Sequence, residues 1–294
     1  MDCMVSKILK YSILVSFLMQ ASCQTSVVQK VDSPANTDNV LTVEQKESIK
    51  DLQDEITVGK SIAAKILGTY GVYKKEPAKT QYVKILGTSL AKQFGRAELV
   101  FYFEILDTDE MNAFATPGGY VFITKGLLSN VKSESELATI LAHEIAHINR
   151  KHMYKEIMPK KEVSTGENLN RILSRGASDI GKSLAQAVQQ GMKLLLEKGI
   201  GQEAEFDADV VGVQYAAAAG YNPTSLKNVL KRVQSLLKTD SQMSHTHPPF
   251  EKRYTFIDQT IKENGLPVRM TANEKNIAKR FKNAFGEVGE SINE

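Results

Sequence analysis

The sequence has no tryptophan, only two cysteines and only five histidines among its 294 residues. Both cysteines, Cys3 and Cys23, fall in the first 23 residues, so we expect a mature chain without an internal disulfide. Internal repeats and low-complexity tracts are absent, which excludes a solenoid. The formal net charge of +3 is small, and no arginine-rich or aromatic-interleaved patch occurs. We therefore expect no nucleic-acid partner.

The first residues differ in kind from the rest of the chain. Two lysines precede an apolar run of nine residues, Tyr11–Met19, and Gln20-Ala-Ser-Cys23 follows. This is the layout of a secretory signal, and the run is too short to span a bilayer. We predict a signal peptide over residues 1–23, a periplasmic location and a lipid anchor on Cys23, because its setting resembles the lipobox of bacterial lipoproteins. The alternatives are an ordinary signal cleaved nearby and a short buried N-terminal helix.

The remaining chain divides by composition into three parts. Residues 24–39 are polar and predict a flexible tether, residues 40–270 predict one domain, and residues 271–294 predict a polar, helical C-terminal tail. At 42% hydrophobic residues, the chain is able to bury a sizeable core. We predict a mostly α fold with a small β-sheet (α+β). Helices are expected over residues 42–67, 77–94, 133–149, 203–219, 222–238 and 250–264, and within 160–200; strands are expected over 99–106 and on both sides of Pro117-Gly-Gly119.

The stretch LAHEIAHINRKH, Leu141–His152, holds three of the five histidines. His143 and His147 are four residues apart on a predicted helix, so both rings project from one face. Two such imidazoles can hold a zinc ion at about 2.0–2.1 Å, and Glu144 beside the first can take a proton from a water. Chance occurrence and surface histidines are the alternatives. The apolar residues on both sides of the motif favour a buried zinc site.

A catalytic zinc ion needs a third protein ligand. Glu205 and Asp209 are four residues apart on an otherwise apolar predicted helix, where two carboxylates are costly without a cation. Glu205 is the candidate third ligand, and Asp209 is a candidate acceptor for the second ring N–H of a ligating histidine. The alternative is that both acids lie on a solvated face. His152, five residues after His147, is expected to point away from the ligand face as a packing or capping group.

These motifs resemble the HtpX and CAAX-prenyl-protease family of zinc metallopeptidases. His143-Glu-Ile-Ala-His147 is followed by Glu205-Phe-Asp-Ala-Asp209, which is similar to that family's Glu-x-x-Ala-Asp element. The segment Asn112-Ala-Phe-Ala-Thr-Pro-Gly-Gly-Tyr and the late Thr246-His-Pro248, with Arg253 after it, also resemble family elements. The resemblance covers residues 60–260 and is closest to the exported, soluble bacterial branch (BepA- and LoiP-like). It implies a zincin-type fold with one Zn²⁺ per chain.

The resemblance also implies roles for two later residues. His247 and Arg253 would stabilise the negative charge that develops on the scissile carbonyl oxygen. His247 has two alternatives: it occupies the open zinc position at rest, or it is a surface loop residue. The strand near Tyr120–Thr124 is expected either as an edge that pairs with an extended substrate or as an interior strand.

The predicted function is a zinc-dependent endopeptidase of the bacterial cell envelope, with protein or peptide substrates. The resemblance implies misfolded or misassembled envelope proteins as those substrates. A chaperone-like protein that holds clients behind a closed zinc site is the alternative. A zinc-dependent amidase shares the first motif but does not predict the Glu205-x-x-Ala-Asp209 element.

Overall fold

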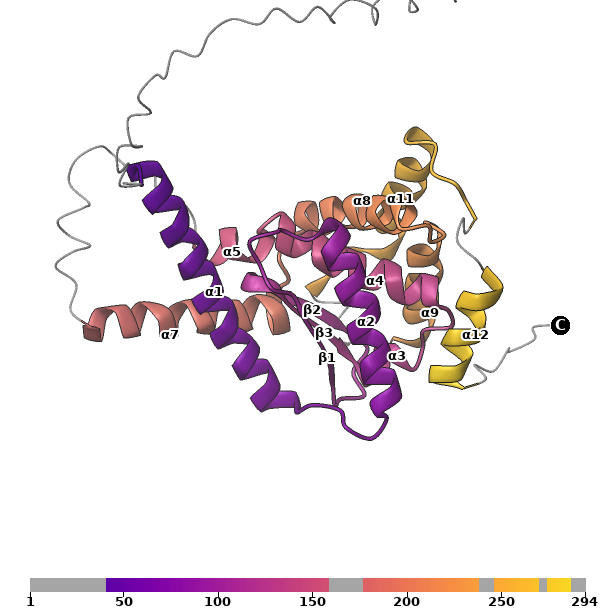
Figure 1. Cartoon of the computed structure of the whole chain (residues 1–294), viewed down its shortest axis with the longest axis horizontal. Helices are drawn as coiled ribbons and strands as arrows, with labels where there is room; N and C mark the ends of the chain where they lie inside the picture. The colour runs from indigo at the N-terminus through magenta and orange to yellow at the C-terminus, as the bar shows by residue number, and fades with distance from the viewer. Residues whose placement is uncertain (1–40, 159–176, 238–245, 270–273, 287–294) are drawn as a thin grey trace, which may run out of the picture. The chain divides into compact units, whose positions relative to one another are not determined.

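A computed structural model describes residues 41–158, 177–237, 246–269 and 274–286 (Figure 1). The predicted signal peptide, both cysteines and the tether lie outside these residues. Within the described part, helices dominate and the strands form one three-stranded sheet, so the predicted mostly α class is confirmed. No helix of this part is both long enough and apolar enough to cross a bilayer.

Two long helices begin the folded unit, α1 (Val43–Tyr70) and α2 (Pro77–Phe94). Helix α2 has the predicted bounds because Pro77 stands in its first turn, where a missing N–H removes no helical hydrogen bond. Helix α1 packs against strand β2 (Ala113–Thr116) and the short turn η1 (Pro117–Gly119) that follows it. Helix α2 packs against strand β1 (Tyr102–Leu106).

The sheet has the strand order β1-β3-β2, with β3 (Tyr120–Thr124) in the centre. Strand β3 pairs in parallel with β1, with Tyr102 opposite Tyr120, and antiparallel with β2, with Ala113 opposite Ile123. The turn η1 joins β2 to β3 through Gly118 at φ 77° and Gly119 at φ 101°. L-residues with a side chain rarely adopt these values, so the paired glycines allow the chain to reverse here. The two strands predicted around Pro117-Gly-Gly119 are confirmed.

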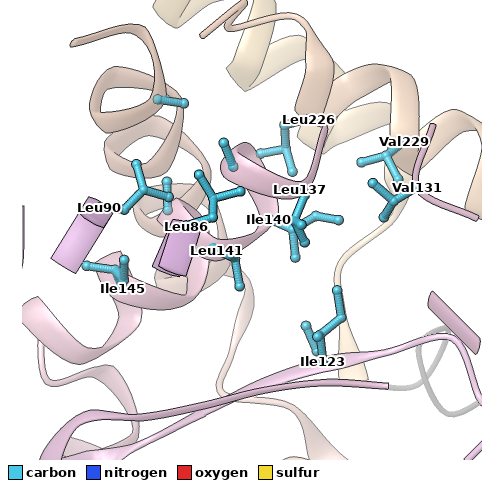
Figure 2. Packing of buried hydrophobic residues seen from close by; sticks show 14 of the residues in the cluster. Leu86, Leu90, Ile123, Val131, Leu137, Ile140, Leu141, Ile145, Leu226 and Val229 are labelled. Atoms are coloured by element: carbon cyan, nitrogen blue, oxygen red, sulfur yellow. The ribbon is translucent and has the colours of Figure 1, made fainter. Parts of the chain in front are cut away.

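Helix α4 (Glu134–Asn149) packs against the sheet, α2 and α8 (Gln202–Ala218). The Ser133 hydroxyl accepts a hydrogen bond from the Glu136 backbone N–H and caps the helix. Leu137 and Leu141 are fully buried against residues of α2 and of the later helix α9 (Ser225–Leu236) (Figure 2). Burial along almost its whole length makes α4 a fixed platform for the side chains it carries.

The other helices are shorter or lie later in the chain. They are α3 (Lys125–Leu128), α5 (His152–Ile157), α7 (Ala177–Lys193), the π-helical turn η2 (Leu194–Lys198), α11 (Phe250–Glu263) and α12 (Glu274–Phe285). Helices predicted over 203–219, 222–238 and 250–264 correspond to α8, α9 and α11. In the segment expected as a polar tail, α12 contributes Ile277 and Phe281 to the main core. Its Arg280 pairs with the buried Glu134 at the start of α4.

The closest approach of α8 to α4 depends on Gly212. A Cβ atom at this position would lie 2.7 Å from the Cα and 2.8 Å from the backbone nitrogen of His143. Such distances are below van der Waals contact, so only glycine allows the two helices to approach this closely at the first histidine of the motif. The glycine therefore sets how near α8 lies to the side chains of α4.

Candidate metal centre

Helices α4 and α8 bring together the three residues that the motifs single out as ligands. The Nε2 atoms of His143 and His147 lie 3.1 Å apart. Glu205 Oε2 lies 3.7 Å from Nε2 of His143, and Glu205 Oε1 lies 3.5 Å from Nε2 of His147. One ligand atom from each residue falls within 4.8 Å of the others. All three side chains are buried.

The donor set fits a zinc ion. Ligands at about 2.0–2.1 Å in tetrahedral geometry stand about 3.3 Å from one another, which is close to the spacing of these atoms. Glu205 Oε2 is buried and has no hydrogen-bond partner within the described residues. Among the described residues around the cluster, the three carboxylates of Glu144, Glu205 and Asp209 outnumber the single guanidinium group, that of Arg253. A buried acidic surplus and an unsatisfied carboxylate oxygen both favour a cation between the imidazoles.

Glu144 lies one residue beyond His143 on α4 and lines two cavities at the site. Burial raises the pKa of its carboxyl to about 7; the neighbouring Glu205 acts in the same direction and His143 opposes it. A carboxyl group with a pKa near neutrality can both accept and return a proton at neutral pH. This is the property that a general base needs.

Asp209 lies one helical turn beyond Glu205 and is completely buried. Its Oδ1 atom stands 3.0 Å from Nδ1 of His143, on the side of the ring away from the ligand cluster. Arg253 of α11 donates two hydrogen bonds to Asp209, from Nε at 2.8 Å and from Nη2 at 2.7 Å. Although burial alone raises the pKa of Asp209, Arg253 lowers it overall. Burial also opposes protonation of His143, yet Asp209 and Glu205 raise its pKa to about 10 in the metal-free site.

His247 lies on the flank of the cluster. Its Nε2 is 3.6 Å from Glu205 Oε2, and its Nδ1 is 2.9 Å from the hydroxyl of Thr246. The structure thus brings His247 to the site and does not leave it on a surface loop. Arg253 also reaches the cluster, with Nη1 4.0 Å from Glu205 Oε2. Every site residue predicted from the sequence is buried or nearly buried around one centre.

Two cavities flank Glu144 and His247. The first has an apolar wall from one face of α9. That wall consists of Leu226, Val229, Leu230 and Val233. The second lies between β2 and η2. Ala113 of β2 lines both, so this strand runs past the site.

Strand β2, and not β3, is the edge strand beside the site. Of the two alternatives for Tyr120–Thr124, the interior strand is the one observed, because β3 has a partner on each side. Within the described residues, β2 forms backbone ladder bonds with β3 alone. The four residues of β2 are buried, and the strand borders the cavity that Glu144 lines.

Two residues at the site were not predicted to act there. Asn112 is buried and lines the first cavity, and its amide nitrogen has no partner within the described residues. His152 was expected to point away from the ligand face as a packing or capping group; its Nδ1 lies 3.0 Å from Nδ1 of His147, the ring nitrogen on the side away from the cluster. The available signal for Asn112 was its place at the start of the family-like segment Asn112-Ala-Phe-Ala-Thr-Pro-Gly-Gly-Tyr; helical spacing gave none for His152.

A helix carrying two histidines and a base, a glutamate from a second helix and an adjacent edge strand together define a zincin-type metallopeptidase centre. The sequence profile of peptidase family M48 matches residues 77–261, and the chain belongs to this family. It is therefore a member of a metallopeptidase family, and the resemblance seen in the motifs is confirmed.

Similar proteins come from bacteria and from mitochondria. The chain is 29% identical over 212 residues to the beta-barrel assembly-enhancing protease of Yersinia pestis, covering 68% of this chain and 42% of that protein. It is 26% identical over 185 residues to the protein of that name in Escherichia coli K12, covering 60% and 38%. The mitochondrial metalloendopeptidase OMA1 of Schizosaccharomyces pombe is 27% identical over 190 residues, covering 63% and 53%. The chain thus spans between 38% and 53% of the length of these relatives.

Proposed function

We propose that this metallopeptidase is a zinc-dependent endopeptidase of the bacterial cell envelope that cleaves misfolded or misassembled proteins. The observation that carries the chemistry is the convergence of His143, His147 and Glu205 within 4.8 Å beside the buried Glu144. In this proposal the three residues hold one zinc ion. When bound, zinc supplies a Lewis acid that lowers the pKa of water and polarises the scissile carbonyl.

Glu144 acts as the general base and then as the general acid. Its carboxylate takes a proton from the attacking water and returns it to the leaving amine, a cycle that suits a pKa of about 7. Substitution of this one carboxylate should therefore stop the reaction without removing a metal ligand.

His247, Arg253 and Asn112 provide positive charge and donors for the carbonyl oxygen. His247 and Arg253 line the first cavity together with Glu144, and the Asn112 amide nitrogen is a donor with no partner among the residues that the structure describes. Donors already fixed in place stabilise a developing oxyanion because they need not reorganise. Asp209 has a different role: its Oδ1 lies 3.0 Å from Nδ1 of His143, where a carboxylate favours the proton on Nδ1 and leaves Nε2 of that ring for the metal.

The substrate is an extended polypeptide that pairs with β2. The place of β2 at the edge of the sheet, with β3 as its ladder partner among the described residues, supports backbone pairing with little dependence on side-chain sequence. The aliphatic wall of the first cavity supports an apolar side chain next to the scissile bond. Misfolded proteins expose both extended backbone and apolar side chains, so this site suits them as substrates.

The envelope location rests on the N-terminal residues and on the bacterial relatives. The export pattern of residues 1–23 and the lipobox-like Cys23 support a lipid-anchored periplasmic protein, joined by a tether over residues 24–39 to the catalytic domain. The bacterial relatives are named for assembly of β-barrel proteins, which supports a role in envelope protein quality control.

Hydrolysis of casein by the purified chain and its Glu144→Gln variant tests this function. We expect the variant to bind one zinc ion per chain and to lose at least about 10²-fold in rate, because the base is missing. Glu205→Gln serves as the comparison and should lose zinc affinity as well as hydrolysis. Equal hydrolysis by wild type and Glu144→Gln, or none by zinc-loaded wild type, would favour a client-holding protein instead.

A further inference from the structure

His147 has a partner on the side of its ring away from the metal cluster. Its Nδ1 atom lies 3.0 Å from Nδ1 of His152, and the two rings meet edge to face with centroids 5.0 Å apart. The Nε2 atom of His152 lies 3.1 Å from Oδ2 of Asp207, which also pairs with Nε of Arg150 at 3.1 Å. A continuous chain of three polar groups therefore leads from His147 toward solvent.

When His152 is neutral, only one arrangement of protons gives a hydrogen bond at both contacts of the series His147–His152–Asp207. A histidine that binds a metal through Nε2 keeps its proton on Nδ1, so His147 must donate to His152 Nδ1. His152 must then carry its own proton on Nε2, from which it donates to Asp207. Asp207 accepts this bond, and each group thus determines the tautomer of the group before it.

The backbone is built to present His152 in this place. Helix α4 ends at Asn149, and Lys151 adopts the left-handed conformation with φ 55°, which no other non-glycine residue in the described part has. Residues with a Cβ atom adopt this conformation at a cost, so surrounding contacts must hold it. Lys151 Nζ is held from α1 by Asp51 at 2.7 Å and by Glu55 at 3.1 Å. The reversed chain then begins α5 with His152 facing back toward His147.

We infer that His152 and Asp207 are positioning residues that fix the ring and tautomer of His147 and thereby strengthen metal binding. The arrangement is the counterpart of Asp209 behind His143, so each imidazole of the pair has a polar partner on its distal nitrogen. Removal of such a partner typically weakens metal affinity by about 10- to 100-fold. The inference rests on the proposed zinc ligands but does not require hydrolysis.

The test is the zinc dissociation constant, measured by competition with a chromophoric chelator, for full-length wild type and three variants. His152→Phe keeps a ring but removes the acceptor, and we expect zinc binding to weaken by about 10- to 100-fold. His152→Gln offers an amide oxygen to His147 and should return affinity to within about threefold of wild type. Ile157→Ala, on the same helix but buried between α1 and α7, is the matched control and should leave affinity unchanged.

Three outcomes would overturn the inference. The first is a zinc dissociation constant of His152→Phe within about twofold of the wild-type value. The second is zinc binding that is weakened equally in His152→Phe and His152→Gln. The third is zinc binding that is weakened as much in Ile157→Ala as in His152→Phe. The second would mean that ring packing matters and not the acceptor; the third would mean that any loosening of α5 has the same effect. Failure of zinc-loaded wild type to cleave casein would instead count against the proposed function, while the zinc constants would still decide the role of His152.

Discussion

Arg253 donates two hydrogen bonds to Asp209, at 2.8 and 2.7 Å, and both side chains are buried. The pair ties α11 to α8 directly behind the first histidine of the motif. Because Asp209 also meets His143 Nδ1, one carboxylate links the helix packing of the fold to the orientation of a candidate ligand. Stability and metal binding are therefore coupled at this residue.

Replacement of Arg253 by Met should destabilise the protein strongly. It leaves the buried Asp209 without its cation, which typically costs about 3–5 kcal/mol in the free energy of unfolding. Adding Asp209→Asn to the same chain should recover part of that loss, because an amide needs no counter-charge. Urea denaturation of the metal-free proteins measures both effects. A loss below about 1 kcal/mol for Arg253→Met would show that Asp209 does not depend on this pair.

Gly212→Ala should destabilise the protein although alanine is the better helix former. In an open helical position this change stabilises by up to about 1 kcal/mol. At Gly212 the new Cβ would lie 2.7 Å from His143 Cα, so α8 must move away from α4, at a cost of about 1–3 kcal/mol. We expect a lower melting temperature and weaker zinc binding from the displaced Glu205.

The control for this change is Gly68→Ala. Gly68 lies exposed in α1, and a Cβ there would meet nothing within 4 Å. This variant should melt at the same or a higher temperature than wild type and bind zinc equally well. If Gly212→Ala also raised the melting temperature, the close approach of α8 to His143 would not be a constraint.

The local elements of the fold could be predicted because each has a local cause. Pro77 begins α2, Ser133 caps α4, and Gly118 and Gly119 supply the positive φ values of the turn between β2 and β3. The order of the strands could not be predicted in this way. Strand β1 pairs with β3 and not with β2, the strand that follows it in the sequence. Because both β2 and β3 are largely buried, no alternation of polar and apolar residues shows which of them is the edge strand.

In the candidate site, too, features with a local cause could be predicted and features that depend on tertiary contacts could not. The four-residue spacing of His143 and His147 predicted one shared face, because both belong to a single uninterrupted helix. The contact of His152 with His147 could not be predicted from helical spacing, because the chain turns left-handed at Lys151. That turn depends on Asp51 and Glu55, about a hundred residues earlier, and such tertiary ion pairs leave no local pattern in the sequence.

Asn112→Ala should impair hydrolysis far more than it impairs folding. Its amide nitrogen has no partner in the described part of the chain, whereas its Oδ1 accepts the Ala113 backbone N–H at 2.9 Å. Loss of one fixed donor to a developing oxyanion typically lowers kcat by about 10²- to 10³-fold. Loss of the Ala113 bond costs only about 1 kcal/mol in stability. Zinc affinity should not change.

Asn130→Ala provides the comparison for that experiment. The Asn130 amide donates to Gly126 O at 2.9 Å, and this residue lines neither of the two cavities at the site. It should lose similar stability and keep its hydrolytic rate. Parallel losses of rate in both variants would mean that Asn112 supports the local fold and not the reaction.

The ion pair between Glu134 and Arg280 should make stability depend on pH in a predictable direction. Glu134 is almost fully buried and also accepts hydrogen bonds from Tyr82 and from Tyr221, the latter at 2.6 Å. Burial alone raises the pKa of Glu134, but Arg280 and the two tyrosines lower it overall. A carboxyl with a lowered folded-state pKa stabilises the fold above its ordinary pKa, and that contribution is lost as pH falls through the lowered value.

Arg280→Met should therefore reduce the free energy of unfolding by about 1–2 kcal/mol at pH 7, after allowance for the solvent exposure of Arg280. The difference from wild type should shrink as pH falls below about 4, because Glu134 becomes protonated in both proteins. Lys84→Met, which removes a more exposed pair with Glu104, is the control and should change stability by less than about 0.5 kcal/mol. Denaturant titrations from pH 3 to pH 7 measure these differences. If Arg280→Met had the same loss in free energy of unfolding over this whole pH range, the effect of Arg280 would come from packing of its aliphatic side-chain atoms and not from its charge.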